Sequence, residues 1–185
     1  MNIIGKHVRL RAVEERDLAE FNLWANDPEI QKLLGGWHFP TSLCDQEAWF
    51  SSFDCNSNEQ RFSIETDELG LIGTAHLTSI DWKNRNAFQG MLLAKPEVRR
   101  KGYGVDTIMA MMRFAFDELG LENLAGDMIE YNKPSVKAYT EHCGWKVQGV
   151  QPEWYYRSGQ RWDKILVGIS SQNYRDLMES KDYWK

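Results

Sequence analysis

Apolar and polar positions repeat along the chain with two periods, one typical of strands and one typical of helices. Residues 7–13 alternate and predict a strand, whereas residues 14–27 have apolar side chains at helical spacing and predict a helix. Further strands are predicted at residues 61–65, 71–80, 87–93, 124–131, 145–150, 154–156 and 162–169. Further helices are predicted at residues 30–34, 41–53, 105–119, 132–142 and 170–180.

The order of these segments predicts the fold class. Short polar turns between residues 61 and 93 and near residues 157–160 favour antiparallel hairpins, while helices join the other strands. We therefore expect one α+β domain over residues 1–185, with a mixed, mostly antiparallel sheet flanked by helices. Thr41 or Ser42 would cap the helix at 41–53. The core-facing side of that helix is expected to carry Cys44, Ala48, Trp49 and Phe53.

A basic, glycine-containing turn at residues 95–104 joins a predicted strand to the helix at 105–119. Free backbone N–H groups and the helix dipole meet at such a turn, so it predicts an anion site. A P-loop is excluded because the lysine precedes Gly102, and the dinucleotide fingerprint fails because Thr107 stands where its third glycine belongs. A turn whose glycines only satisfy backbone geometry remains an alternative.

Composition excludes several classes of protein. The net charge of −5 argues against general nucleic-acid binding and mildly favours a cationic partner such as an amine. No apolar run approaches the length of a membrane span, and the first residues do not resemble a signal peptide. Cys44, Cys55 and Cys143 are odd in number and lack metal-like spacing. We expect reduced thiols in the cytoplasm and no metal site.

Several segments resemble the GNAT superfamily of acetyl-CoA-dependent N-acetyltransferases, in particular its RimJ/RimL/SpeG-like branch. Residues 99–104 fit the family pattern Arg/Gln-x-x-Gly-x-Gly/Ala. Residues 132–145 are similar to its Asn-x-x-Ser-x-x-x-Tyr…Gly-Phe segment. Stretches typical of the branch are found at residues 114–121, 148–149 and 156–163. The resemblance implies the GNAT (acyl-CoA N-acyltransferase) fold and a site for acetyl-CoA as co-substrate.

In this family acetyl-CoA lies where two parallel strands splay apart, here those ending near Leu93 and Tyr131. The resemblance implies a set of CoA-binding residues: Met91, Leu92, Leu93, Arg99, Arg100, Lys101, Gly102, Tyr103, Gly104, Asn132 and Ser135. Asn132 also stands where a helix N-cap belongs. Tyr139 corresponds to the family tyrosine that protonates the leaving thiolate, a transfer between groups whose ordinary pKa values differ by about 1.5 units.

The chain departs from the family pattern at the position of the general base. Relatives commonly carry a glutamate where this chain has Phe88 and Gln89, neither of which can accept the proton of an amine. Glu130 is our predicted base, and alternatives on nearby strands are Asp127, His76 and Glu153. Pro152 also replaces an arginine of many relatives, which predicts altered contacts with the acceptor.

The acceptor is expected to be a primary amine: a small-molecule amine, an amino sugar or its nucleotide, or a peptide N-terminus. Trp37, His38 and Phe39 lie in a loop rich in glycine and proline and would form a substrate-side wall, although such a loop can also tuck rings into the core. The aromatic loop and the negative net charge of the chain favour a small cationic or amino-sugar acceptor. Alternatives are a non-catalytic acyl-CoA-binding protein and a nucleic-acid binder, and relatives are often homodimers.

Overall fold

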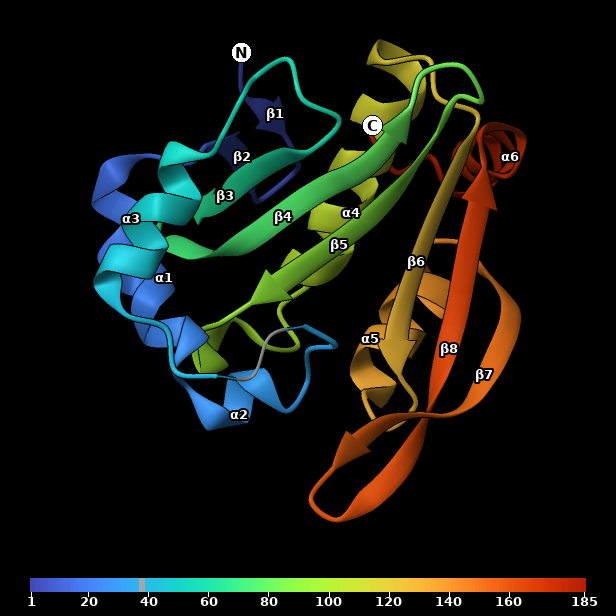
Figure 1. Ribbon diagram of the computed structural model, residues 1–185. Helices are drawn as coiled ribbons and strands as arrows, with labels where there is room; N and C mark the ends of the chain where they lie inside the picture. The colour runs from blue at the N-terminus through green and yellow to red at the C-terminus, as the bar shows by residue number, and fades with distance from the viewer. Residues whose placement is uncertain (37–38) are drawn as a thin grey trace.

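The computed structural model describes residues 1–36 and 39–185, and its eight strands form one sheet in the order β1-β2-β3-β4-β5-β6-β8-β7 (Figure 1). The strands are β1 (Ile3–Ile4), β2 (Arg9–Ala12), β3 (Gln60–Thr66), β4 (Gly70–Asp81), β5 (Asn86–Leu93), β6 (Asn123–Ile129), β7 (Lys146–Arg157) and β8 (Gln160–Ser170). Strands β5 and β6 pair in parallel, and the other neighbours pair antiparallel. The predicted α+β class with a mixed, mostly antiparallel sheet is confirmed.

The helices are α1 (Leu18–Ala25), α2 (Pro28–Gln31), α3 (Leu43–Ser51), α4 (Tyr103–Arg113), α5 (Lys133–Lys137) and α6 (Ser171–Lys181). Short 3-10 turns at Glu15–Asp17 and Pro96–Val98 precede α1 and α4. Wider π-helical turns at Phe114–Glu118 and Ala138–His142 extend α4 and α5. Among the helices of residues 1–36 and 39–185, none combines the length and the apolar character of a membrane span.

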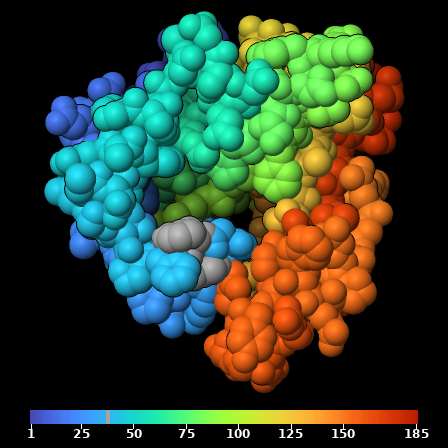
Figure 2. Space-filling model, in the orientation of Figure 1, coloured from blue at the N-terminus to red at the C-terminus, as the bar shows by residue number. Residues whose placement is uncertain are grey.

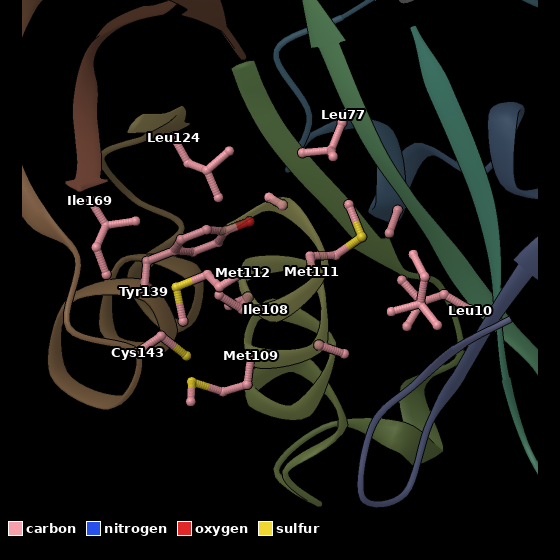
Figure 3. Packing of buried hydrophobic residues seen from close by; sticks show 14 of the residues in the cluster. Leu10, Leu77, Ile108, Met109, Met111, Met112, Leu124, Tyr139, Cys143 and Ile169 are labelled. Carbon is pink, nitrogen blue, oxygen red and sulfur yellow. The ribbon is translucent and has the colours of Figure 1, made fainter. Parts of the chain in front are cut away.

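Two clusters of apolar side chains cover opposite faces of the sheet. Met91 and Leu93 pack against the larger cluster, which includes the apolar side of α4, whereas Leu92 between them packs against a smaller cluster that includes residues of α1. Successive residues of a strand point to opposite faces, so the two clusters lie on either side of β5. Figure 3 shows part of the larger cluster, in which methionines of α4 fill the space below the sheet.

The predicted inward face of the helix at 41–53 is wrong in most of its residues. Ser42 does cap α3, but Cys44 and Ala48 are exposed, and Phe53 is also on the surface. The buried residue of α3 is Gln46, while Trp49 is half-buried against Phe21. The helix lies at the edge of the smaller cluster and contributes aromatic rings there, so it has no continuous apolar stripe.

Two strand predictions also differ from the structure. Strand β1 is only two residues long and was not predicted, because so short a segment has no readable period. The segments predicted at 145–150 and 154–156 are one long strand, β7, whose register against β8 shifts between Gln151 and Tyr155. Pro152 lies in this irregular stretch. Proline has no backbone N–H, and at this position no regular hydrogen bond between β7 and β8 is lost.

Candidate active site

Strands β5 and β6 run side by side over only three residue pairs, from Asn86↔Asn123 to Phe88↔Ala125. Strand β5 continues to Leu93 and β6 continues to Ile129, but beyond Phe88 and Ala125 the two strands no longer pair with each other. From Gln89 onward, the β6-facing edge of β5 therefore has no strand partner in the described part of the chain. The divergence is visible in Figure 1, and Figure 2 shows the molecule hollowed between the green strands and the orange β7–β8 hairpin.

The basic turn lies between the end of β5 and the start of α4. Arg100 and Gly102 have positive φ angles of 62° and 85°, which turn the chain sharply into the helix. The first helical bond runs from the N–H of Asp106 to the carbonyl of Gly102 at 2.9 Å, so the N–H groups of residues 103–105 have no acceptor among the described residues. A side chain on Gly102 would meet no protein atom within 4 Å, so its Cα faces open space.

The same turn carries three exposed cations, Arg99, Arg100 and Lys101. Gly104 packs closely on β5: an added Cβ would lie 3.2 Å from the Met91 side chain and 3.5 Å from that of Leu93. The turn is thus held against the unpaired end of β5. Open N–H groups, a nearby positive charge and a strand edge without a partner are features that a phosphate with an amide-containing arm can use.

Asn132 caps α5, as predicted, because its side chain accepts the N–H of Ser135. Tyr139 follows in the π-helical turn after α5 and is only 3% exposed. Its ring packs edge-on against Trp145, with centroids 4.9 Å apart. Figure 3 shows the Tyr139 hydroxyl pointing away from Cys143 and Ile169.

The Tyr139 hydroxyl is protonated at neutral pH. Burial raises its pKa well above the ordinary value, and the neighbouring Cys143 adds to the rise. The side-chain amide of Gln89 acts in the opposite direction and lowers the pKa of Tyr139. Burial also raises the pKa of the Cys143 thiol, to about 12, so this thiol stays neutral as well.

The four candidate bases have different surroundings. The Glu130 carboxylate, just beyond β6, accepts the backbone N–H of Asp163 at 3.0 Å. Asp127 bonds the Tyr155 hydroxyl at 3.1 Å and the Lys164 ammonium at 2.8 Å. The Glu153 side chain is exposed.

His76 lies opposite Gly90 of β5, where an added Cβ would come within 2.4 Å of its imidazole nitrogen. Burial, with a smaller contribution from the positive charge of Arg61, lowers the pKa of His76 to about 4. The ring is neutral at physiological pH, but so low a pKa makes it a weak base.

Of the predicted substrate loop, Trp37 and His38 lie outside the described residues. Phe39 lines a pocket of about 430 Å³ between the end of α1, α2 and the tip of the β7–β8 hairpin. The other lining residues are Ala25, Asn26, Pro28, Gln31, Lys32, Pro40, Tyr156, Arg157 and Ser158. Within residues 1–36 and 39–185, no three His, Cys, Asp or Glu side chains are grouped to hold a metal ion.

The hairpin and the loop after α2 are tied together. Arg157 donates to the Leu34 carbonyl at 3.0 Å, and Tyr131 donates to the Lys32 carbonyl. Tyr155 packs on Gly35, where an added Cβ would lie 2.7 Å from the tyrosine oxygen. Sequence patterns do not predict this contact, because Leu34 and Arg157 are 123 positions apart in the chain.

Comparisons with known proteins agree with this geometry. The sequence matches the acetyltransferase (GNAT) domain family over residues 7–146. It is 25% identical to a Bacillus subtilis prophage-derived uncharacterized N-acetyltransferase, YokL, over 92% of this chain and 93% of that protein. It is also 25% identical to spermidine N(1)-acetyltransferase of Vibrio cholerae, over 95% of this chain and all of that protein.

Among solved structures, the crystal structure of Vibrio cholerae spermidine N-acetyltransferase with CoA and spermine matches with a TM-score of 0.84 and 24% identity. The match covers 91% of this chain and 98% of that chain. The matched family spans most of the chain and includes β5, the basic turn and Tyr139. The chain therefore belongs to the GNAT acetyltransferase family and is an acetyl-CoA-dependent N-acetyltransferase.

Proposed function

We propose that this enzyme acetylates the primary amine of a small molecule in the cleft between β5 and β6. The observation that carries the proposal is the loss of strand pairing after Phe88, beside a buried, protonated Tyr139. An unpaired strand edge supplies backbone groups for the thioester arm, and a phenol next to it supplies a proton. The narrower assignment to the RimJ/RimL branch stays a prediction.

On the CoA side, the N–H groups of residues 103–105 would bind the pyrophosphate and the cations of the turn would attract it. Backbone groups of Met91, Leu92 and Leu93, on the edge of β5 that has lost its partner β6, would form hydrogen bonds with the pantetheine arm. Asn132 and Ser135 lie at the start of α5, where they would contact the same arm. These roles rest on the open space at Gly102 and on the unpaired edge of β5.

The reaction is direct attack of a neutral amine on the thioester carbon. A backbone N–H near Leu93 would stabilise the oxyanion that develops on the carbonyl oxygen. When the carbon–sulfur bond breaks, its electron pair goes to sulfur, and Tyr139 would donate its proton there. The amine reaches the site protonated, so a base must first remove a proton from it; Glu130 is our proposal for that base, because it stands just beyond the end of β6. The nitrogen of the tetrahedral adduct then loses a second proton to solvent as the neutral amide forms.

The pocket beside the hairpin would receive the acceptor. Its ten described lining residues include Lys32 and Arg157 but no Asp or Glu, and residues 30–44 contain no carboxylate. A polyamine needs negative partners, whereas amides, a hydroxyl and aromatic rings suit the hydroxyls and faces of a sugar. The lining therefore favours an amino sugar over a polyamine.

We also propose a cytoplasmic location, because the odd number of cysteines in the sequence fits reduced thiols.

The test is release of the CoA thiol from acetyl-CoA with a panel of amines: amino sugars and their nucleotides, polyamines, aminoglycosides, amino acids and N-terminal peptides. A reaction without amine corrects for the protein's thiols, of which Cys44 and Cys55 are exposed. We expect turnover with amino sugars above that with polyamines. Acetyl-CoA binding without turnover on any amine would overturn the proposed reaction, and turnover with polyamines alone would overturn the acceptor class.

Tyr139→Phe tests the acid. We expect kcat to fall by about 10²–10⁴-fold while acetyl-CoA affinity changes little, because the ring remains and only the proton donor is lost. Unchanged kcat would remove Tyr139 from the chemistry. Tyr174→Phe is the matched control, because Tyr174 is equally buried, at 2% exposure, but lies on α6 and packs against Phe116.

A further inference from the structure

The imidazole of His76 lies on the face of the sheet that is turned away from α4. Met91 and Leu93 of β5 pack against the larger cluster with α4, so Gly90, one position before Met91, faces the other side. His76 of β4 stands directly opposite Gly90, and paired residues of neighbouring strands share a face. Figure 1 shows α4 behind β4 and β5, so the ring lies on the near side, where Figure 2 shows the hollow.

The tip of this imidazole reaches across β5. A Cβ added to Gly90 would lie 2.4 Å from the Nε2 atom and 2.6 Å from the Cε1 atom of His76. The ring therefore extends from β4 over the Cα atom of Gly90, in the direction of the β5 edge that has no partner beyond Phe88. A side chain at position 90 would occupy the place of the ring tip, and glycine leaves that place free.

Neither ring nitrogen of His76 forms a hydrogen bond with a residue of 1–36 or 39–185. Arg61 stands opposite His76 on β3, but its guanidinium bonds Glu59 at 2.9 Å and lies 5.6 Å from the centre of a Trp49 ring. Burial and the charge of Arg61 lower the pKa of His76, and Glu59 acts weakly in the opposite direction. The ring is therefore neutral, and a neutral imidazole has one nitrogen that accepts a hydrogen bond.

We propose that His76 binds the attacking amino group of the acceptor: its Nε2 accepts one N–H of the amine, so that the nitrogen lone pair is directed to the thioester carbon. The inference rests on the proposed acetyl transfer in the cleft between β5 and β6. A primary amine has two N–H bonds and one lone pair, so an acceptor that holds one N–H limits the directions of the lone pair. The ring keeps its own proton on Nδ1 and takes none from the amine.

An uncharged partner for the amine fits the pocket beside the hairpin, whose described lining includes Lys32 and Arg157 but no carboxylate. A carboxylate stabilises the ammonium form, which has no lone pair for the attack. A neutral imidazole instead binds the free amine, which is the reactive form. The hydroxyls of an amino sugar withdraw electrons and lower the pKa of its amine, so an amino sugar supplies more of this form than a polyamine does.

Substitutions at His76 test the proposal, with glucosamine as the acceptor or, if another amine of the panel above reacts faster, with that amine. His76→Phe keeps a ring without nitrogen and should lower kcat/KM for the amine by about tenfold, the effect of one hydrogen bond. Acetyl-CoA affinity in calorimetry should change less than about twofold. His76→Gln offers an amide oxygen as acceptor and should recover most of the loss. Thr78→Val is the control, since Thr78 shares this face of β4 but stands opposite Phe88, where β5 still pairs with β6.

Gly90 gives an independent test that leaves the imidazole in the protein. Gly90→Ala would place a methyl group where the ring tip lies, so it should displace the ring and lower kcat/KM for the amine as His76→Phe does. The three protein atoms nearest to the added Cβ all belong to the His76 ring. In a His76→Ala background the same substitution should therefore cause no further loss. If His76→Phe fails to fold, this pair of backgrounds carries the test.

Unchanged kcat/KM for the amine in His76→Phe would overturn the proposal. Equal losses in His76→Gln and His76→Phe would show that the ring only packs on β5, and equal losses from Gly90→Ala in both backgrounds would show that the ring is not what the methyl group displaces; either result would also overturn it. A wild-type enzyme that binds acetyl-CoA but acetylates no amine of the panel would instead overturn the proposed function, before any variant is compared.

Discussion

Arg11 joins two carboxylates in the interior, one from the start of α1 and one from β3. Its guanidinium bonds both Asp17 oxygens at 2.7 and 2.8 Å, and its Nε lies 2.6 Å from Glu65. Ser63 donates to Asp17 at 2.7 Å. Burial alone would raise the pKa of Asp17, but the hydrogen bonds from Arg11, the Glu14 backbone and Ser63 outweigh it, and the pKa is lowered.

A group with a lowered folded-state pKa stabilises the protein above its unfolded pKa and loses that effect as the pH falls. We predict that Asp17→Asn lowers the free energy of unfolding by about 3 kcal/mol at neutral pH, since a buried pair loses one partner. The difference from wild type should shrink as the pH falls below about 4, where the Asp17 of unfolded wild type becomes protonated. Urea unfolding at several pH values measures it, with Asp54→Asn as an exposed control. A difference that does not depend on pH would contradict the assignment.

A substitution at Gly102 tests whether the basic turn binds CoA. Its φ of 85° disfavours any side chain, but a Cβ there would touch no protein atom. We predict that Gly102→Val weakens CoA binding at least tenfold in calorimetry, because the added methyl groups would occupy the space that we propose for the pyrophosphate. Gly70→Val is a matched control, with a φ of 62° and equally open space in the β3–β4 turn. Equal CoA affinity in the two variants would remove the basic turn from the site.

Local sequence signals predicted some site residues and missed others for a physical reason. The cap at Asn132 follows from local backbone chemistry, so the sequence alone predicted it correctly. Gln89 could be read only as a residue unable to act as a base. Its burial at the point where β5 and β6 diverge is set by tertiary packing, which no local pattern reports.

At the scale of elements, periodicity predicted the strands that alternate clearly. It did not predict the buried face of a helix that lies at the edge of an apolar cluster. The helix α1 buries Leu18, Phe21 and Trp24 as its spacing predicts. The helix α3 instead buries Gln46, because it meets its neighbours through a few aromatic rings at one edge. The packing of the loop after α2 on the β7–β8 hairpin has no local signal at all.

That packing can be tested at Gly35. An added Cβ would lie 2.7 Å from the Tyr155 oxygen, and Tyr155 is held by its bond to Asp127. We predict that Gly35→Ala lowers the free energy of unfolding by about 1–3 kcal/mol, as overpacking does, and raises KM for the amine more than KM for acetyl-CoA. Gly36→Ala is the control, since a Cβ there meets nothing within 4 Å. Equal changes in stability and KM for the two variants would show that the loop can move away from Tyr155 without loss of stability, and would contradict the prediction.

At the scale of the whole molecule, one carboxylate joins both ends of the chain to the helix behind the basic turn. Asp106 of α4 is 1% exposed and accepts the backbone N–H groups of Lys6, His7 and Val8 at 2.7–3.0 Å. It also accepts the Tyr183 hydroxyl at 2.9 Å. The segment before β2 and the last residues are therefore held on the first turn of α4, directly behind the basic turn.

We predict that Asp106→Asn lowers the free energy of unfolding by about 2–4 kcal/mol, because the amide nitrogen replaces an acceptor with a donor and leaves buried N–H groups unsatisfied. Tyr183→Phe, which removes a single bond to the same carboxylate, should cost about 1 kcal/mol. Because α4 orients the N–H groups of the turn, Asp106→Asn should also weaken CoA binding, whereas Tyr183→Phe should not. Urea unfolding and calorimetry measure the two effects. Equal destabilisation by both variants would mean that the backbone N–H groups find water instead, and that the ends of the chain do not depend on Asp106.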